Sequence, residues 1–209
     1  MVSKKEIPAH DHAALLVVDM QIDFCPGGSL AVTGADSIVP TINKYVELFS
    51  RSGLPVYATR DWHPAETTHF SQFGGQWPLH CVQGSRGADF HPNLRLPRDV
   101  IIVSKGNNPQ RDDYSPFQVS DADGMTFLER LRKTGVIHLY LCGLATDYCV
   151  KCSALDALQA GFRVTVLTDA VKGVDLTQGD SQRALEAINR AGGEMGDLES
   201  FRKGPADTH

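Results

Sequence analysis

The stretch Leu139-Tyr-Leu-Cys-Gly-Leu-Ala-Thr-Asp-Tyr-Cys149-Val-Lys151 combines a strand, a turn and the start of a helix. The apolar run 136–142 has the length of a buried strand, and Gly143 breaks it. Thr146 and Asp147 are residue types that favour the N-cap of a helix, and an amphipathic segment follows from residue 148 to residue 160. The stretch therefore predicts a strand–turn–helix unit with Cys149 in the first turn of the helix.

Cys149 has two interpretations on this stretch alone. Unpaired backbone N–H groups and the helix dipole stabilise negative charge at a helix start, which favours a thiolate there. The alternative is that Cys149 is a small core residue, as most free cysteines are. Because strand–turn–helix units commonly carry reactive groups, the stretch leaves a nucleophile and a core residue about equally open.

The same alternation of strand and helix runs along the whole chain. Apolar runs of strand length occur at residues 13–18, 55–59, 100–103, 136–142 and 163–167. Helical patterns occur at residues 36–52, 125–133, 147–160 and 181–191, and a short strand is expected near Glu194 or Met195. Uniformly apolar strands alternating with helices predict a three-layer α/β/α sandwich with a mostly parallel, Rossmann-like sheet.

Length and composition indicate one domain. The chain has 209 residues, of which 42% are hydrophobic, and this is enough for a full core. Residues 1–209 are therefore expected to form a single domain, with residues 1–12 as a flexible tail. Residues 62–98 are rich in Pro, Gly, His and Trp without any period, which predicts a long functional loop that forms a metal site or a lid.

Charge and cysteine content exclude several classes of protein. The net charge is −5 with no basic block, so no nucleic-acid surface is expected. The apolar runs are too short to cross a membrane, and the polar N-terminal segment lacks the apolar core of a signal peptide. Five cysteines, an odd number, argue against a disulfide framework and for the reducing cytoplasm. The C-x-x-C formed by Cys149 and Cys152 lies inside the predicted helix, which argues against a redox motif.

Chemically active side chains follow the predicted strands. In parallel α/β sheets the functional site lies beyond the carboxyl ends of the strands. The residues expected there are Asp19, Asp61, Lys105, Cys149 and Asp169.

Asp19, Lys105 and Cys149 are chemically complementary. A carboxylate within hydrogen-bond range can take the proton of a thiol, and an ammonium group stabilises both anions in a pocket of low dielectric. The alternative is a plain ion pair between Asp19 and Lys105 at two strand ends. Three complementary groups at one sheet edge favour a catalytic interpretation.

Asp61-Trp-His63 follows the second strand, and His69 and His80 lie further along the same loop. Alternate residues at a strand end point the same way, and carboxylate and imidazole groups bind divalent metals. The alternative is that these histidines are surface residues or core hydrogen-bonding groups. Without a thiolate ligand, the set Asp61, His63 and His80 favours a catalytic or substrate-orienting zinc, iron or manganese ion over a closed structural site.

Aromatic residues lie in polar loops around the same edge. Phe24, Trp77 and Tyr114 are able to form the walls of a slot for a flat ring, or simply to anchor their loops.

Five stretches resemble the nicotinamidase/pyrazinamidase family within the isochorismatase-like cysteine hydrolase superfamily. They are V-V-D-M-Q-I-D-F-C-P-G-G-S-L (17–30), A-T-R-D-W-H-P (58–64), W-P-L-H-C-V-Q-G-S-R-G-A-D-F-H (77–91), V-S-K-G (103–106) and L-C-G-L-A-T-D-Y-C-V (141–150). The resemblance covers roughly residues 13–170. It implies the isochorismatase-like hydrolase fold.

The resemblance also implies roles for individual residues. The family's catalytic triad falls on Asp19, Lys105 and Cys149, and the backbone N–H groups of Ala145 and Cys149 form its oxyanion hole. A cis peptide is implied before Ala145.

The ligands and the substrate slot follow in the same way. Metal ligands fall on Asp61, His63 and His80, with His69 as the fourth ligand that some members have. The substrate-binding positions fall on Phe24, Trp77, Tyr114 and Leu144.

The implied activity is the hydrolysis of nicotinamide, and also pyrazinamide, to the acid and ammonia through a cysteine thioester, in NAD salvage. The implied cofactor is one divalent metal ion, with zinc favoured over iron or manganese. The implied partner is a small-molecule substrate, and a homo-oligomer is left open. The alternatives are another amide or carbamoyl hydrolase of the superfamily, an isochorismatase that cleaves a vinyl ether, and a non-catalytic binding or metal-storage protein; the Asp61–His63–His80 set counts against the first two.

Overall fold

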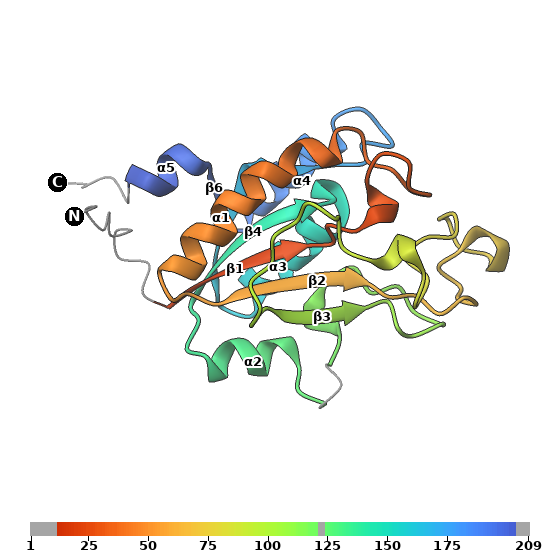
Figure 1. Ribbon diagram of the computed structural model, residues 1–209, viewed down its shortest axis with the longest axis horizontal. Coiled ribbons are helices and arrows are strands. Elements are labelled where there is room, and N and C mark those ends of the chain that lie inside the picture. The colour runs from red at the N-terminus through yellow and green to blue at the C-terminus, as the bar shows by residue number, and fades with distance from the viewer. Residues whose placement is uncertain (1–11, 121–123, 204–209) are drawn as a thin grey trace.

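The computed structural model describes residues 12–120 and 124–203, so the predicted tail lies outside the described residues except for His12. Within these ranges six strands form one sheet in the order β3-β2-β1-β4-β5-β6, and all neighbours are parallel (Figure 1). The strands are β1 (Ala13–Val18), β2 (Val56–Asp61), β3 (Ile101–Lys105), β4 (His138–Leu144), β5 (Arg163–Lys172) and β6 (Glu194–Gly196). This is the strand order of a Rossmann-type sheet, which confirms the predicted fold class.

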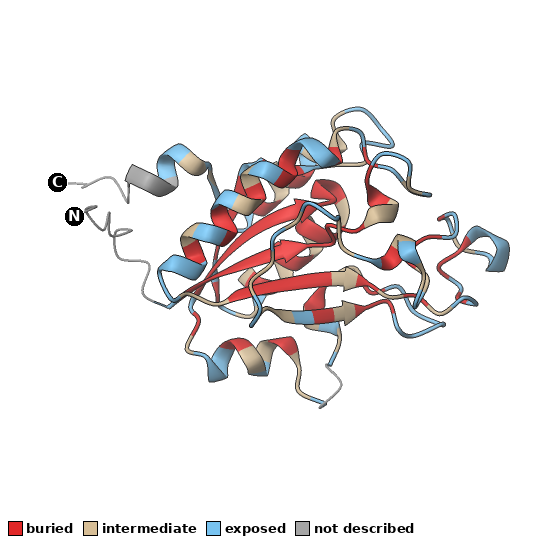
Figure 2. Ribbon diagram, viewed as in Figure 1, coloured by how far each residue is buried: buried red, intermediate tan, exposed pale blue. Residues whose placement is uncertain are grey.

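Helices cover both faces of the sheet. They are α1 (Val39–Arg51), α2 (Phe127–Lys133), α3 (Lys151–Gln159), α4 (Asp180–Arg190) and α5 (Leu198–Lys203). One apolar cluster joins α1 to Leu15 and Val17 of β1, and a second joins α2, α3 and α4 to Leu16 and Val18. Because successive strand residues point to opposite faces, β1 is buried along its whole length (Figure 2). The result is three layers, with α1 on one face and α2, α3 and α4 on the other.

The sheet directs its carboxyl ends to one side of the molecule. All strand neighbours are parallel, and the first part of the long loop after β2 extends beyond the tips of β1, β2 and β3 (Figure 1). β1 and β4 are neighbours at the centre of the sheet. From β1 the following strands build one edge, and from β4 they build the other, so the strand order reverses between β1 and β4. Ligand sites of such sheets form at this switch point.

Three local predictions were wrong in detail. The turn after β4 is a π-helix, Thr146–Val150, that leads into α3, so the predicted N-cap does not form there. β5 continues past the predicted end to Lys172, and α5 was not predicted.

In the described ranges each helix is too short or too polar to cross a bilayer.

Candidate active site

Sheet register brings two of the predicted residues together. Asp61 and Lys105 end neighbouring strands and are directly paired in the β2–β3 register. Asp19 follows β1 with a φ of +47°, in the left-handed region, and its N–H donates to the Thr59 carbonyl over 3.2 Å. The hydroxyl of Thr59 in turn donates to Asp19 Oδ1 over 2.6 Å. Neighbouring strands thus fix the backbone and one oxygen of Asp19.

Lys105 is the centre of a buried charge cluster. Its side chain is fully buried, and Nζ lies 2.8 Å from Asp19 Oδ2 and 3.3 Å from Cys149 Sγ, and it also donates to Asp61 Oδ1. The three N–H bonds of one ammonium group therefore have three acceptors. Apart from this ion pair with Lys105, Asp19 Oδ2 has no hydrogen-bond partner among the described residues, so it keeps a lone pair for a proton.

The cluster shifts the titration of its members. Burial alone would raise the pKa of Asp61, but the Lys105 ammonium lowers it well below its ordinary value. Burial opposes the charge of Lys105, yet the carboxylates of Asp19 and Asp61 raise the pKa of the ammonium. Burial raises the pKa of Asp19 and of the Cys149 thiol, and Lys105 offsets only part of each shift. The resting state is therefore a thiol beside a carboxylate whose basicity is increased.

Cys149 lies in the π-helix at the end of β4. The i to i−5 hydrogen bond from Val150 N to Ala145 O measures 3.1 Å. Cys149 is 6% exposed, and its sulfur lies within 4.8 Å of a carboxylate oxygen of both Asp19 and Asp61. The peptide bond between Leu144 and Ala145 is cis, as the resemblance implied. The strand–turn unit that first singled out Cys149 thus delivers it to the two carboxylates.

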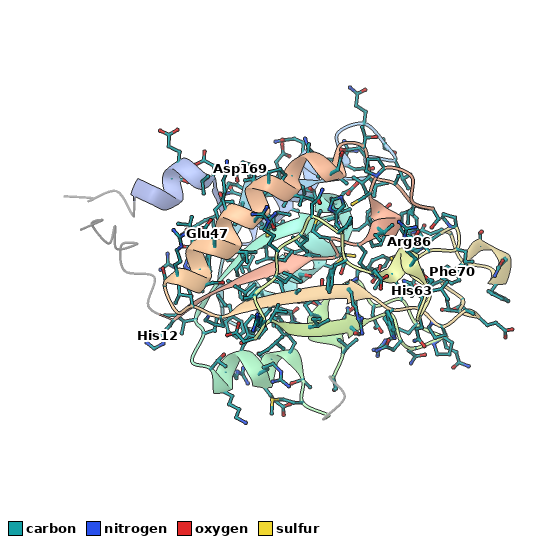
Figure 3. All side chains as sticks on the ribbon, viewed as in Figure 1. His12, Glu47, His63, Phe70, Arg86 and Asp169 are labelled. Carbon is teal, nitrogen blue, oxygen red and sulfur yellow. The ribbon has the colours of Figure 1, made fainter. Side chains whose placement is uncertain are left out.

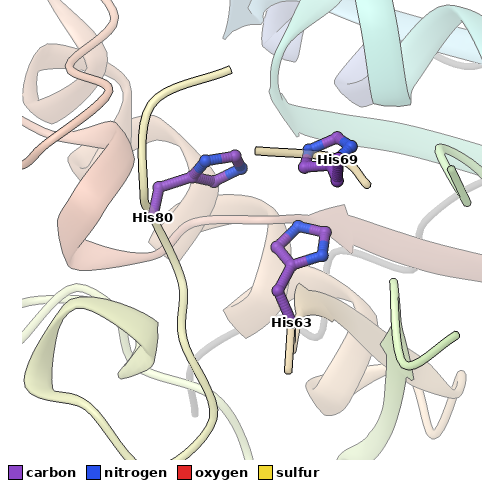
Figure 4. A group of neighbouring side chains, drawn as sticks. All are labelled: His63, His69 and His80. Atoms are coloured by element: carbon purple, nitrogen blue, oxygen red, sulfur yellow. The ribbon is translucent and has the colours of Figure 1, made fainter. Parts of the chain in front are cut away.

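Three histidines converge beside this cluster (Figure 4). His63, His69 and His80 each offer one ring nitrogen within a 4.8 Å group. In each ring Nδ1 already has a partner: the Gly106 carbonyl at 3.2 Å for His63, Asp112 Oδ1 at 2.6 Å for His69 and the Pro78 carbonyl at 2.7 Å for His80. These bonds hold the rings so that Nε2 faces the common centre, as the outer partners of metal-bound histidines do.

The donor set fits a divalent metal ion. His63 Nε2 is buried without a hydrogen-bond partner among the described residues. Asp61 Oδ2 lies 3.6 Å from His63 Nε2 and 3.9 Å from His80 Nε2. Burial lowers the pKa of His80 to about 4, so its imidazole is neutral and its lone pair is free near pH 7. Three imidazole nitrogens and one carboxylate oxygen are a set that zinc, iron and manganese accept.

Gly106 and Gln21 position the histidine group relative to the buried charge cluster. Gly106 follows Lys105 with a φ of +73°, and a Cβ there would run into the ring of His63. Gln21 is fully buried and holds Asp61 on both sides: Oε1 accepts from Asp61 N, and Nε2 donates to Asp61 O, each over 2.7 Å. A glycine and a glutamine thus keep the histidine group against the end of the sheet.

A small pocket opens onto both groups. Its lining comprises Asp19, Phe24, Leu30, Val32, Asp61, His69, Trp77, His80, Tyr114, Ala145, Tyr148 and Val174. Trp77 Nε1 donates to the Tyr114 hydroxyl over 2.9 Å, and the Tyr148 ring meets Trp77 edge-on with centroids 5.0 Å apart. Aromatic walls and a few charged groups at one end suit a small flat ring.

Two predicted positions lie elsewhere. Leu144 is buried in the apolar cluster under α1, and its neighbour Ala145 lines the pocket instead. The expectation that Asp169 reaches the site was wrong, because β5 continues past it. Its oxygens bond the Tyr45 hydroxyl and the N–H of Leu198, far from His63 (Figure 3).

The sequence did not predict three residues that hold other parts of the site in place. Gln21 follows Asp19 by two positions in the same loop, but no sequence pattern indicates its contact with Asp61, which lies 40 positions along the chain. Asp112 had no signal either, because residues 106–120 show no period. Asp147 was predicted as a helix cap, but its carboxylate binds Val174 N and Asp175 N.

The chain is similar in sequence to a family of hydrolases and to a curated relative within it. A model of the family described as "Isochorismatase domain" matches residues 13–200. The nicotinamidase of Escherichia coli strain K12 is 41% identical over 206 residues, covering 91% of this chain and 97% of the relative.

The fold is also similar to those of two solved structures. The pyrazinamidase of Pyrococcus horikoshii in complex with zinc superposes with a TM-score of 0.83 at 44% identity, covering 90% of this chain and 99% of that one. The PnC1 protein of L. infantum in complex with nicotinate superposes with a TM-score of 0.80 at 34% identity, covering 90% and 93%.

Proposed function

The chain belongs to the isochorismatase family, and we propose that it is a nicotinamidase that hydrolyses nicotinamide, and pyrazinamide, to the acid and ammonia. The observation that supports this most is that one small aromatic pocket reaches both the Asp19–Lys105–Cys149 cluster and the three-histidine group. The Escherichia coli relative is named a nicotinamidase and the Pyrococcus structure a pyrazinamidase, and the L. infantum structure holds nicotinate. NAD salvage is the pathway in which nicotinamide is such a substrate.

In the proposed reaction Cys149 is the nucleophile and Asp19 is its base. Asp19 takes the thiol proton on Oδ2, and Lys105 stabilises the thiolate from 3.3 Å. The sulfur attacks the amide carbon, and the developing oxyanion is held by the N–H groups of Ala145 and Cys149. Each such donor is worth about 3 kcal/mol in other hydrolases. Asp19 then returns the proton to the leaving nitrogen, and ammonia departs.

The second half of the reaction regenerates the enzyme. The acyl group is now a thioester on Cys149. A water molecule gives a proton to Asp19 and its oxygen to the acyl carbon. The C–S bond breaks, the thiolate recovers a proton, and the pyridine carboxylate is released.

The ring is proposed to lie between Phe24 and Trp77, with Tyr114 beside it. The Trp77–Tyr114 hydrogen bond fixes the far wall of this slot. Leu144, which lies behind Ala145 in the core, is proposed to act only by supporting that residue.

Asp61, His63, His69 and His80 are proposed to hold one divalent metal ion, and zinc is the metal of the Pyrococcus structure. When bound, the ion supplies a Lewis acid that binds and orients a ring nitrogen. The five free cysteines support a reducing compartment, and we place the protein in the cytoplasm. The single domain over residues 1–209 and the homo-oligomer stay predictions.

A coupled ammonia assay tests the function. Purified protein with zinc and a thiol reductant is given nicotinamide, pyrazinamide or an N-carbamoyl amino acid. Release of ammonia from the first two and not from the third supports the proposal. Activity with the carbamoyl compound alone would assign another amidohydrolase activity, and release from none of them would leave a binding protein.

A further inference from the structure

Asp147 is a buried carboxylate that the proposed mechanism does not use. It lies two residues before Cys149 in the same π-helix and is 3% exposed. Its Oδ1 accepts the N–H of Val174 over 3.0 Å, and its Oδ2 accepts the N–H of Asp175 over 2.8 Å. Both oxygens therefore hold the backbone of one distant segment, about 27 residues along the chain.

That segment, residues 173–175, connects β5 to the approach of α4, and we call it the strap. Gly173 passes so close to Asp147 and Ser181 that a Cβ would overlap them. Asp175 has a φ of +50°, and its carboxylate accepts the N–H and the hydroxyl of Ser181 over 2.8 and 2.7 Å. The strap is thus fastened on one side to the nucleophile's turn and on the other to the start of α4.

The central residue of the strap reaches the pocket. Val174 lines it together with Leu30 and Val32, and it packs against the apolar cluster that contains Phe24 and Ala145. These aliphatic side chains form the part of the lining that offers no hydrogen bonds, whereas the histidines and carboxylates form the polar part. A rigid aliphatic wall limits the shape of a ligand, because interiors resist expansion.

We propose that Asp147 is a positioning residue that fixes Val174 as a wall of the pocket, and that this wall sets the largest ring substituent the site accepts. The inference rests on the proposed function for its substrate, a pyridine- or pyrazinecarboxamide. One side chain thus joins the wall directly to the turn that carries Cys149.

Val174 is the first test. We would measure kcat/KM for nicotinamide and for its ring-methylated isomers with wild type, V174A and V174L. One methyl group is worth about 10- to 200-fold in discrimination. V174A should raise the ratio of methylated to parent substrate by about 10-fold or more for at least one isomer, and V174L should lower it. The change should appear mainly in KM.

Asp147 is the second test, with a matched control. In D147N one acceptor becomes an NH₂ group that faces a backbone N–H, so the strap loses a hydrogen bond and is repelled. Asp180 also accepts a backbone N–H of this connection, from Thr177 over 2.8 Å, but it does not line the pocket. D147N should shift the isomer ratio in the same direction as V174A, and D180N should leave it within about 2-fold. In the D147N/V174A double variant the shift should be smaller than the product of the two single shifts, as coupled residues require.

A binding measurement tests the wall without turnover. The affinities of nicotinate and its methylated forms are measured by calorimetry with the C149A variant and with the C149A/V174A double variant. Isomer ratios for V174A and D147N that match those of D180N, in turnover and in binding, would overturn the inference. Wild type that binds pyridine carboxylates with the expected wall dependence but releases no ammonia would remove the proposed function alone. Failure of both turnover and binding would remove both.

Discussion

The two halves of the site are built on different principles. Asp19, Asp61 and Lys105 end or follow parallel strands, and hydrogen-bonded register sets their spacing. His69 and His80 come from the long loop after β2, where isolated bridges and side-chain contacts take the place of a ladder. The strand half is held by the core of the protein, and the loop half is held by a few named hydrogen bonds. The proposed reaction chemistry thus lies mainly at the strand ends, and the proposed ring orientation depends mainly on the loop.

The largest effect should come from the nucleophile. Cys149→Ala removes the atom that forms the thioester, so turnover of nicotinamide should fall by about 10⁴-fold or more. Urea unfolding and metal content should stay close to wild type, because Lys105 loses only its contact with sulfur and keeps both carboxylate partners. Cys152→Ala, three residues on and outside the pocket lining, is the matched control. Residual turnover within 100-fold of wild type would remove Cys149 from its role.

Lys105 tests whether the strand half is held by its charges. Lys105→Met leaves Asp19 and Asp61 as two buried carboxylates without their cation, which typically costs about 3–5 kcal/mol. The free energy of unfolding, measured with urea, should fall by that amount, and activity should be lost. Arg51→Gln breaks the exposed pair with Glu47 and should cost no more than about 1 kcal/mol. Equal costs for the two variants would contradict the buried-cluster account.

Metal removal tests the loop half by itself. Dialysis against a chelator should abolish activity and lower Tm, since an ion present at about 100 times its Kd contributes about 2.7 kcal/mol. His80→Ala should purify with much less than one ion per chain. His91→Ala, whose ring lies outside the histidine group, should keep full occupancy. Full activity after rigorous chelation would exclude a role for the metal.

The smallest effect should come from the partner of a ligand. Asp112 Oδ1 accepts the hydrogen bond of His69 Nδ1 over 2.6 Å, and its side chain is half exposed and lies outside the pocket lining. Asp112→Ala should weaken zinc binding, measured by competition with a fluorescent chelator, by about 10-fold. Glu66→Gln, an exposed change in the loop that carries His69, should leave affinity unchanged. An affinity for Asp112→Ala equal to wild type would show that the loop holds His69 without it.

The two halves also differ in how far the sequence predicts them. Apolar runs ending in Asp19, Asp61 and Lys105 located the strand half, because strand ends of a parallel sheet must meet at one edge. The same rule failed for Asp169, since a strand may continue beyond its apolar run. His63 and His80 were predicted as ligands from donor chemistry and spacing, whereas His69 as a fourth ligand came from resemblance.

Contacts that bind one loop to another were out of reach of the sequence. Gln21, Asp112 and Asp147 each act through hydrogen bonds to backbone or side chains 27 or more positions away. No local pattern encodes such a partner. The π-helix before α3 has the same cause, because Asp147 faces the strap instead of capping a helix.

Because β1 lies at the centre of the sheet, it determines when the sheet and the site can assemble during synthesis. β1 pairs with β2 and with β4, and Ala13 meets His138 in that second register. A growing chain that has released only β1, β2 and β3 therefore exposes an unpaired edge of β1 and has no thiol at the carboxylates. Contacts across more than 120 residues close slowly. Most of the chain must therefore be synthesised before the site can assemble, and until then one edge of β1 stays unpaired.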